Sequence, residues 1–221
     1  MKSTVSRFLK ENKSLLLFIS LMLVFRSAVA DWNDVPTGSM KPTIVEGDRI
    51  LINKMAYDLK LPFSQQSIVK FADPERNDIV IFESKAADKR LVKRVIGIPG
   101  DIVSMNKNQL IVNQEAANYK VVDRNNNFVL SEESINGQSH LIRTKLPVGS
   151  RNYSERTSFK EFTVPHGFYL MMGDNRDNSA DSRSIGLVPR AEIIGRSSKV
   201  AFSLNYDQYL LPRSERFLKA I

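Results

Sequence analysis

A serine in a tight turn and a lysine in a strand-like segment are the two residues of this sequence that could form a catalytic pair. Ser39 lies between glycine and methionine, in a segment that proline bounds on both sides, Pro36–Pro42. A serine hydroxyl is a weak nucleophile and needs a neighbouring base to take its proton. Most serine hydrolases use histidine as that base, whereas this sequence offers Lys93. Taken singly, each residue has an ordinary interpretation, as a turn serine and as a surface lysine, so the pairing carries the hypothesis.

Lys93 can act as a base only when its amine is neutral. It is flanked by Leu91 and Val92 on one side and by Val95 and Ile96 on the other. Burial among apolar side chains disfavours the charged form of a lysine. Lowering its pKa from about 10.4 to about 8 requires roughly 3 kcal/mol of differential stabilisation. A half-buried, inward-pointing lysine in a strand meets that requirement.

A third polar segment, residues 173–183, follows a strongly apolar stretch. Its density of Asp, Asn, Arg and Ser is typical of a solvated loop with Asx-turns. It also contains complementary charges that could lock the loop, namely Asp174, Asp177 and Asp181 with Arg176 and Arg183. A rigidly bridged loop is a good support for a hydroxyl such as Ser179.

The elements that must position these residues read as short strands. Apolar and β-branched residues alternate in segments bounded by Gly, Pro, Asn or Asp, which is typical of strands and turns. Helical periodicity is scarce after residue 31. We therefore predict a mainly β protein with a curled antiparallel sheet or barrel-like core. The expected strands cover residues 48–53, 78–82, 90–96, 101–104, 109–112 and 167–172.

Residues 114–163 are more polar than the rest of the chain. They include the run Arg124-Asn125-Asn126-Asn127 and the run Glu132-Glu133-Ser134. We predict a smaller insertion of loosely twisted strands here; a long mobile loop is the alternative.

Composition excludes several classes of site. The chain has 221 residues and no cysteine, so it forms no disulfide, thiolate metal site or cysteine nucleophile. Its two histidines are too few for a three-histidine zinc site, and there is no H-E-x-x-H pattern, so we expect no metal. The net charge of +8 fits nucleic acid or anionic lipid. The basic residues are spread through the chain, and no expected helix carries a concentrated stripe of them. Some lie near the two ends, namely Lys2, Arg7, Lys10 and Lys13 before the apolar run and Arg213, Arg216 and Lys219 near the C-terminus. We therefore expect a lipid surface and no nucleic acid.

The N-terminal segment has two interpretations. Leu15–Phe25 is an apolar run broken only by Ser20, and a helix from Ser14 through Ala30 would reach roughly 25 Å. Such a helix could be a retained membrane anchor, with Trp32 at the interface. Basic residues, an apolar run and Ala28-Val29-Ala30 equally describe a cleavable signal peptide. Both place everything after Asp31 on the exported side.

Together the motifs match a known family. The chain resembles bacterial type I signal peptidases, the membrane-bound Ser/Lys leader peptidases. The resemblance covers residues 32–113 and 164–203 well and residues 114–163 weakly. Besides the apolar anchor it rests, in order, on P-T-G-S-M-K-P-T, G-D-R-I-L-I-N-K, R-N-D-I-V-I-F, K-R-V-I-G-I-P-G-D and M-G-D-N-R-D-N-S-A-D-S-R.

The resemblance implies a role for each matching residue. Ser39 would be the nucleophile and Lys93 its general base. The Ser39 N–H and the hydroxyl of Thr37 would form the oxyanion hole, and Ser179 would orient the Lys93 amine. Three further residues would be structural near the site, namely Gly173, Asp181 and Arg183. Four would line shallow pockets for small side chains, namely Val35, Met40, Leu91 and Val92.

The resemblance also implies an organisation and a location. Residues 1–31 would be a cytoplasmic N-terminus with one transmembrane helix. Residues 32–113 plus 164–212 would be the catalytic β core, 114–163 a variable insertion and 213–221 a basic C-terminal segment. The chain would span the bacterial cytoplasmic membrane once, with its catalytic part on the exported side.

The implied activity is removal of signal peptides from exported preproteins after Ala-x-Ala-type sites, with no cofactor. The resemblance favours retention of the N-terminal helix. A pilin-processing peptidase, a self-cleaving Ser/Lys peptidase and a non-catalytic exported β module are the alternatives. The self-cleaving repressor type should carry a helix-turn-helix before the protease part, and here only an apolar segment precedes it.

Overall fold

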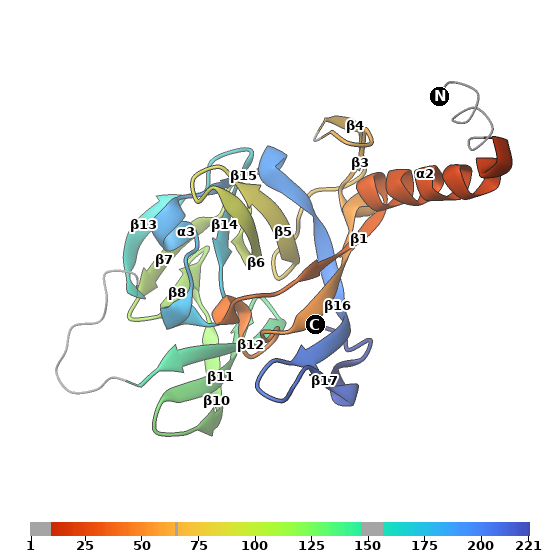
Figure 1. Cartoon of the computed structure of the whole chain (residues 1–221). Coiled ribbons are helices and arrows are strands. Elements are labelled where there is room, and N and C mark those ends of the chain that lie inside the picture. Colours follow the sequence, from red (N-terminus) through yellow and green to blue (C-terminus); the bar gives the residue numbers. More distant parts are fainter. Residues whose placement is uncertain (1–9, 65, 147–156) are drawn as a thin grey trace.

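The computed structural model describes residues 10–64, 66–146 and 157–221, and these are mainly β (Figure 1). Lys2 and Arg7 of the basic N-terminal group lie outside the described residues. The predicted strands are present, with ends that differ by a few residues. The largest sheet has the order β1-β2-β16-β5-β6-β14-β15, with β17 also paired to β16. Its strands are β1 (Ala30–Asp34), β2 (Asp48–Asn53), β5 (Ile79–Ser84), β6 (Lys89–Gly97), β14 (Phe168–Met172), β15 (Val188–Pro189), β16 (Ile193–Asn205) and β17 (Leu211–Pro212).

This sheet is open, so the prediction of a barrel-like core is wrong with respect to closure. Within the described part of the chain, β1 pairs with β2, β15 pairs with β14, and the two end strands do not pair with each other. Closure needs a ladder of hydrogen bonds between the end strands. β15 has only two residues, and one of them is Pro189, which has no N–H to donate.

Alternation of apolar and polar residues explains which face of each strand is buried. In β2, Ile50 and Ile52 are buried, whereas Leu51 between them is exposed. Their buried face packs on Ile81 of β5 and Val200 of β16. Successive side chains of a strand point to opposite faces, so this two-residue period sets the strand register.

Three smaller sheets complete the β structure. One has the order β13-β7-β8-β9, one the order β10-β11-β12, and β3 pairs with β4. The stretch 114–163 thus contributes both a separate three-stranded sheet and, through β9 and β13, edges of its neighbour; its treatment as one insertion stays a prediction. The bounds are β3 (Asp58–Lys60), β4 (Ser67–Lys70), β7 (Ile102–Asn106), β8 (Gln109–Val112), β9 (Glu115–Ala116), β10 (Asn118–Arg124), β11 (Phe128–Ile135), β12 (Gln138–Lys145) and β13 (Phe159–Thr163).

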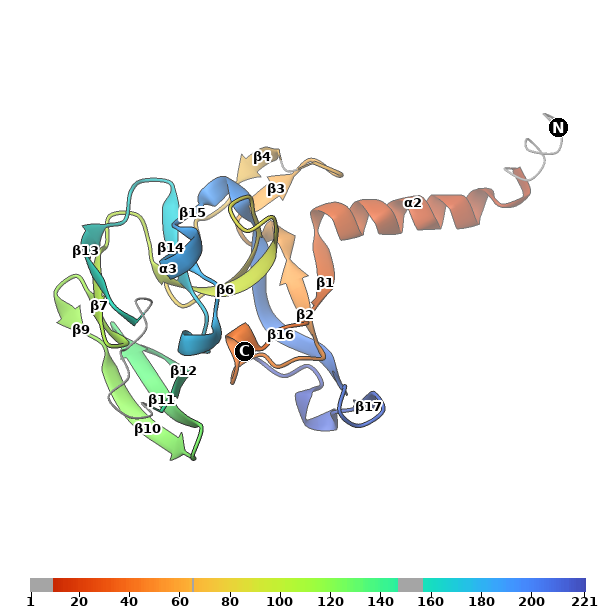
Figure 2. The same cartoon turned by 60° about the vertical axis from the view of Figure 1, so that its left-hand side comes forward.

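The N-terminal apolar run forms helix α2 (Lys13–Ala28), which projects away from the β structure (Figure 2). The helix ends two residues earlier than expected, because Ala30 already pairs with Asn53 as the first residue of β1. Among the described residues, we found no helix that combines the length and the apolar character needed to cross a membrane.

The remaining helices are short. Those with both ends inside the described residues are α3 (Ser182–Ile185) and the 3₁₀ turns η1 (Gly38–Met40), η2 (Lys54–Ala56), η4 (Arg176–Asn178), η5 (Arg190–Glu192) and η6 (Ser214–Arg216).

The basic C-terminal segment packs on the β structure more closely than its composition indicated. Arg216 is buried, and its guanidinium donates through Nε to Asp48 Oδ1 at 2.7 Å. Arg213 donates to the Glu46 carbonyl and to the Ser203 hydroxyl. The prediction that the C-terminal cations face a lipid surface is therefore wrong for Arg216, because its charge is neutralised inside the protein.

Candidate active site

The structure brings the predicted nucleophile and base into contact. Ser39 lies in η1 and Lys93 lies in the middle of β6, 54 residues away in the sequence. The Lys93 amine donates to Ser39 Oγ at 2.7 Å and to the Val92 carbonyl at 2.9 Å. Proton transfer between a hydroxyl and a base requires a separation of this size.

Buried apolar neighbours hold the serine turn in place. Met40 directly after Ser39 is almost fully buried, and so are Val35 before the turn and Ile44 after it. All three belong to one core cluster. The backbone N–H of Ile44 also donates to the Met40 carbonyl. Ser39 itself stays partly exposed because the turn presents it at the edge of this cluster.

Burial of Lys93 fits its predicted role as a base. Its side chain is one of the largest that are fully buried, with 2% of the residue exposed. Burial lowers its pKa to about 8, against the opposing charges of Asp181 and Asp174. A substantial fraction of the amine is therefore neutral in mildly alkaline solution.

The loop that follows β14 is locked by the charges noted in the sequence. Arg183 donates to both carboxylate oxygens of Asp181, at 2.8 Å and 2.7 Å. Burial would raise the pKa of Asp181, but the hydrogen bond and charge of Arg183 hold it below its ordinary value. Asp181 also accepts the Gly173 N–H at 3.0 Å. Asp181 and Arg183 thus tie the two ends of this loop together.

Gly173 lies between the nucleophile and Ser179. A Cβ atom placed on Gly173 would sit 2.5 Å from the Ser39 carbonyl oxygen and 2.7 Å from Ser179 Cβ. Such distances are far shorter than van der Waals contact, so a side chain at this position would displace one of the two serines.

Ser179, which we predicted to orient the Lys93 amine, is buried close to Ser39. The Lys93 amine donates to Ser39 and Val92. The Ser179 hydroxyl lies beside Asp181 and helps to lower the pKa of that carboxyl. Within the described part of the chain it has no hydrogen bond of normal geometry. Its orienting role stays a prediction.

Thr37 precedes the serine turn as the N-cap residue of η1 and is exposed. Its side chain makes no capping hydrogen bond to that turn. The Thr37 hydroxyl therefore does not cap η1. The backbone of Thr37 is extended, and the residue lies two positions before Ser39.

The four predicted pocket residues fall into two pairs. Val35 and Met40 are almost fully buried in the core cluster around the turn. Leu91 and Val92 on β6 are partly exposed and pack against two different core clusters. Of these four residues, only Leu91 and Val92 therefore offer surface to a bound peptide in this structure.

Comparison with known proteins identifies the family. The family model described as "Signal peptidase, peptidase S26" matches residues 8–202. Signal peptidase I of Pseudomonas aeruginosa is 36% identical over 87% of this chain and 72% of its own length. Signal peptidase I of Rickettsia bellii is 32% identical over 88% of this chain and 73% of its own length. The chain belongs to the signal peptidase family, peptidase S26. It is a peptidase.

A solved signal peptidase I from Enterococcus faecalis is also similar to this family member. The two sequences are 26% identical, and the match covers 57% of this chain and 98% of the chain of that structure, with a TM-score of 0.36.

Sequence reasoning noted Asp174 among the charges of the loop but missed Arg94, its buried partner. Arg94 donates to both oxygens of Asp174, at 2.9 Å and 2.7 Å, and both side chains are nearly inaccessible. Burial would raise the pKa of Asp174, but the charge of Arg94 lowers it below its ordinary value. Thr43 donates its hydroxyl to the same carboxylate at 2.5 Å. The pair joins β6 to the loop after β14.

Asn175 is a further residue that sequence reasoning missed. Its backbone N–H donates to the Ser39 carbonyl at 3.0 Å, and its side-chain amide donates to the Gly38 carbonyl at 2.8 Å. These two bonds fix the backbone of the turn that carries Ser39. The only sequence signal was its place inside the Asp/Asn/Arg-rich loop, which did not distinguish it from its neighbours.

Proposed function

We propose that this protein is a membrane-anchored serine endopeptidase that removes signal peptides from exported preproteins by means of a Ser39/Lys93 dyad. The observation that carries the proposal is the 2.7 Å contact between Lys93 Nζ and Ser39 Oγ, made by a lysine whose pKa burial lowers to about 8. Membership of the signal peptidase family supports the substrate class. The family resemblance implies shallow pockets that accept small side chains. Such pockets fit the two alanines of an Ala-x-Ala cleavage site.

The first chemical step forms an acyl-enzyme. Neutral Lys93 accepts the Ser39 hydroxyl proton while Oγ bonds to the carbonyl carbon, and the carbonyl electron pair moves to the oxygen. The Ser39 N–H and the Thr37 hydroxyl donate to that oxyanion. The carbon–nitrogen bond then breaks, and protonated Lys93 gives its proton to the leaving amine.

The second step regenerates the enzyme. The lysine, neutral again, takes a proton from a water molecule as that water attacks the ester carbonyl. The tetrahedral intermediate collapses, Ser39 Oγ leaves, and Lys93 returns the proton to it. The signal peptide departs with a new carboxyl terminus. Buried Lys93 therefore serves as base and acid in both steps.

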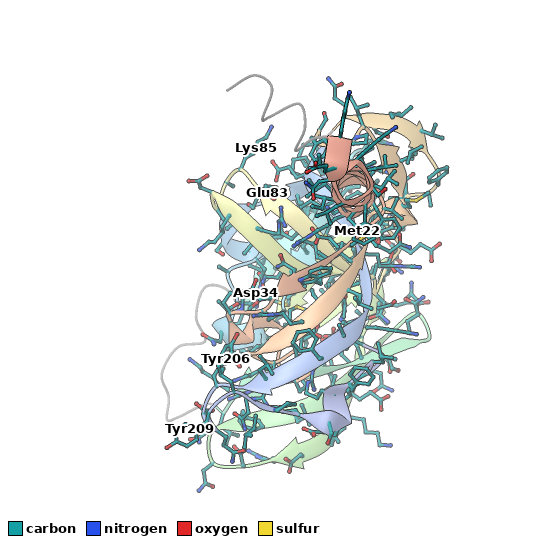
Figure 3. All side chains as sticks on the ribbon, turned by 45° about the vertical axis from the view of Figure 1, so that its right-hand side comes forward. Met22, Asp34, Glu83, Lys85, Tyr206 and Tyr209 are labelled. Atoms are coloured by element: carbon teal, nitrogen blue, oxygen red, sulfur yellow. The ribbon has the colours of Figure 1, made fainter. Side chains whose placement is uncertain are left out.

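Exposed apolar surface supports membrane anchoring. Most large apolar side chains of α2 are exposed, from Leu15 at 55% to Phe25 at 51%, and Leu16 is half-buried. Figure 3 looks almost along this helix and labels Met22, one of these exposed side chains. The hairpin of β3 and β4 adds Phe63, which is 73% exposed and whose N–H donates to Ser27 at the end of α2. Contiguous apolar surface of this extent indicates a lipid or protein partner.

The short connection between α2 and Ser39 also supports membrane anchoring. Ser39 lies nine residues beyond Ala30, at most roughly 30 Å of extended chain. At the base of α2, Arg26 pairs with Asp31 at 2.7 Å and stacks on Trp32. Cations and an indole at this level suit a membrane–water interface. A retained helix would keep Ser39 near the outer leaflet, where cleavage sites of membrane-threaded signal peptides emerge.

The test is cleavage of a preprotein by the purified full-length protein in detergent. The substrate carries an Ala-x-Ala site, and the new N-terminus of the product is sequenced. We expect cleavage directly after the second alanine. Ser39→Ala and Lys93→Ala should each abolish cleavage, and their losses should not add because the two residues act as one unit.

Lys93→Arg is the matched variant, because arginine keeps the charge but cannot lose its proton in this pH range. It should be inactive as well. Turnover near the wild-type rate by Lys93→Arg or Lys93→Ala would remove the dyad mechanism, and cleavage at other residues would remove the proposed specificity.

A further inference from the structure

A buried ion pair joins the three-stranded sheet β10-β11-β12 to the loop beside the dyad. Arg176 in η4 and Glu133 in β11 both have fully inaccessible side chains. Arg176 Nη1 donates to Glu133 Oε1 at 2.7 Å, and Nη2 donates to Glu133 Oε2. A bidentate pair of this kind fixes both distance and orientation. In Figure 1 this sheet lies far from α2, at the opposite end of the molecule.

Glu133 is the centre of a small polar cluster. Tyr119 of β10 donates its hydroxyl to Glu133 at 2.7 Å, and His140 Nε2 of β12 lies 3.1 Å from the same carboxylate. Burial would raise the pKa of Glu133, but the charge of Arg176 holds it far below its ordinary value. The two outer strands of the small sheet, β10 and β12, therefore each supply one residue to the Glu133 carboxylate of the central strand.

The loop that contains Arg176 also contacts the turn that carries Ser39. Asn175, the residue before Arg176, donates to the carbonyls of Ser39 and Gly38. The Arg176 carbonyl accepts from Arg183 Nη2 at 2.6 Å. A displacement of Arg176 would thus move both the serine turn and the guanidinium that pairs with Asp181.

Strand β12 contacts the same loop at two more points. The Arg143 N–H donates to the Asp174 carbonyl at 2.8 Å, and the Lys145 N–H donates to Asp177 at 2.7 Å. These bonds lie on either side of Arg176. Three neighbouring contacts from one sheet therefore determine where the loop sits against η1.

We propose that Glu133 is a positioning residue for the dyad: through Arg176 and Asn175 it sets the position of Ser39 relative to Lys93. The polar stretch 114–163 then supplies part of the support of the active site. This inference rests on the proposed function of Ser39 and Lys93. A purely structural role is the alternative. The two roles can be separated by experiment, because replacing a buried ion pair with apolar residues often leaves stability unchanged or increased.

The first test compares Glu133→Gln with Glu132→Gln in the full-length protein in detergent. Glu132 is the adjacent residue, faces the other side of β11 and is partly exposed, so it is a matched control for the loss of one charge. We expect Glu133→Gln to lower kcat by about 10- to 100-fold, as displacement of a catalytic group by about an ångström does. KM should change less than about twofold, because the surface that binds substrate is untouched. Glu132→Gln should leave both constants within about twofold.

The second test separates positioning from stability. The double variant Glu133→Met/Arg176→Met removes both charges and leaves no unpaired charge buried. Thermal unfolding reports its stability, and kinetics are measured well below the unfolding midpoint. A stable double variant with lowered kcat supports positioning. A stable double variant with wild-type kcat overturns it.

If the double variant does not fold, the single variant Glu133→Gln tests the proposal. Full kcat in folded Glu133→Gln would overturn the proposal, and so would an equal loss in Glu132→Gln. Ser39→Ala measured beside them keeps the two proposals apart. Activity in Ser39→Ala would remove the dyad, whereas an inactive Ser39→Ala with a fully active Glu133→Gln would remove only the positioning role.

Discussion

At the scale of single residues, burial gives Lys93 its reactivity. Lys93 is almost fully buried, and the pKa of its amine falls to about 8 because burial disfavours the charged form. We predict that kcat/KM for preprotein cleavage rises with pH to a plateau, with an apparent pKa of about 8, as the amine loses its proton. The measurement is a pH–rate profile of the free enzyme. A profile that titrates near pH 6.5 would indicate a histidine base instead.

The same burial should destabilise the fold. The pKa of Lys93 is about 8 in the folded state and about 10.5 in the unfolded state. Below pH 8 both states hold the proton, and the folded state bears the full penalty of a buried charge. Between the two values the unfolded state binds more protons, so wild-type stability rises with pH.

We therefore predict that Lys93→Met is inactive but more stable than wild type at pH 7. The gain in the free energy of unfolding should be up to about 3 kcal/mol. It should shrink as the pH rises from 8 to 10.5. Denaturant unfolding at several pH values measures the difference. A pH-independent difference would mean that the folded-state pKa of Lys93 is not lowered.

Thr37 provides the second prediction on the chemistry. Its exposed hydroxyl makes no capping bond, so it is available to a bound oxyanion. Thr37→Val keeps the shape and removes the donor, and it should lower kcat by roughly 10²–10³-fold. Thr37→Ser retains the donor and should be nearly silent. If Thr37→Val kept full kcat, the side-chain donor would have to lie elsewhere.

At the scale of elements, the turn η1, the strand β6 and the loop after β14 must meet closely. Gly173 is the point of closest approach, since any Cβ there would meet the Ser39 carbonyl oxygen at 2.5 Å. We predict that Gly173→Ala lowers kcat by about 10- to 100-fold through displacement of Ser39. It should also reduce the free energy of unfolding by about 1–3 kcal/mol, as overpacking does.

Gly137 offers the control for this substitution. It lies in the hairpin turn between β11 and β12, with φ of +78°, and a Cβ atom added to it would meet no other atom within 4 Å. Gly137→Ala should therefore reduce stability by about 1–2 kcal/mol through backbone strain alone. Its kcat should stay at the wild-type value. A similar kcat loss in both variants would show that general destabilisation, and not the contact with Ser39, is responsible.

At the scale of the whole molecule, an apolar helix projects from one end of a β structure whose other end supports the loop beside the dyad. We predict that this helix is retained and that the protein is recovered from membranes with its N-terminal segment intact. The exposed apolar side chains of α2 and Phe63 would otherwise face water. N-terminal sequencing of protein from the membrane fraction is the measurement. A mature chain beginning at Asp31 in the soluble exported fraction would contradict it and would leave the chemistry of Ser39 and Lys93 untouched.

The sequence by itself determined the types of residue available and the local elements that carry them. Short segments rich in apolar and β-branched residues, bounded by Gly, Pro, Asn or Asp, predicted β2, β6 and β14. The Pro/Gly-bounded turn and the apolar flanks of Lys93 suggested a Ser/Lys pair, since turn residues and apolar neighbours can be read from a local segment of sequence. The family resemblance followed from motifs that are contiguous in the chain.

Only the tertiary structure decided which distant residues meet. The contacts between Lys93 and Ser39 and between Arg176 and Glu133 join residues 54 and 43 positions apart. Glu133 shares a strand face with buried Ser131 and Ile135, a period of two that the sequence contains, but its partner could not be read from it. The open sheet, the burial of Arg216 and the position of Ser179 likewise depend on how separate strands pack. Packing is a property of all the elements together, so no single segment of the sequence encodes it.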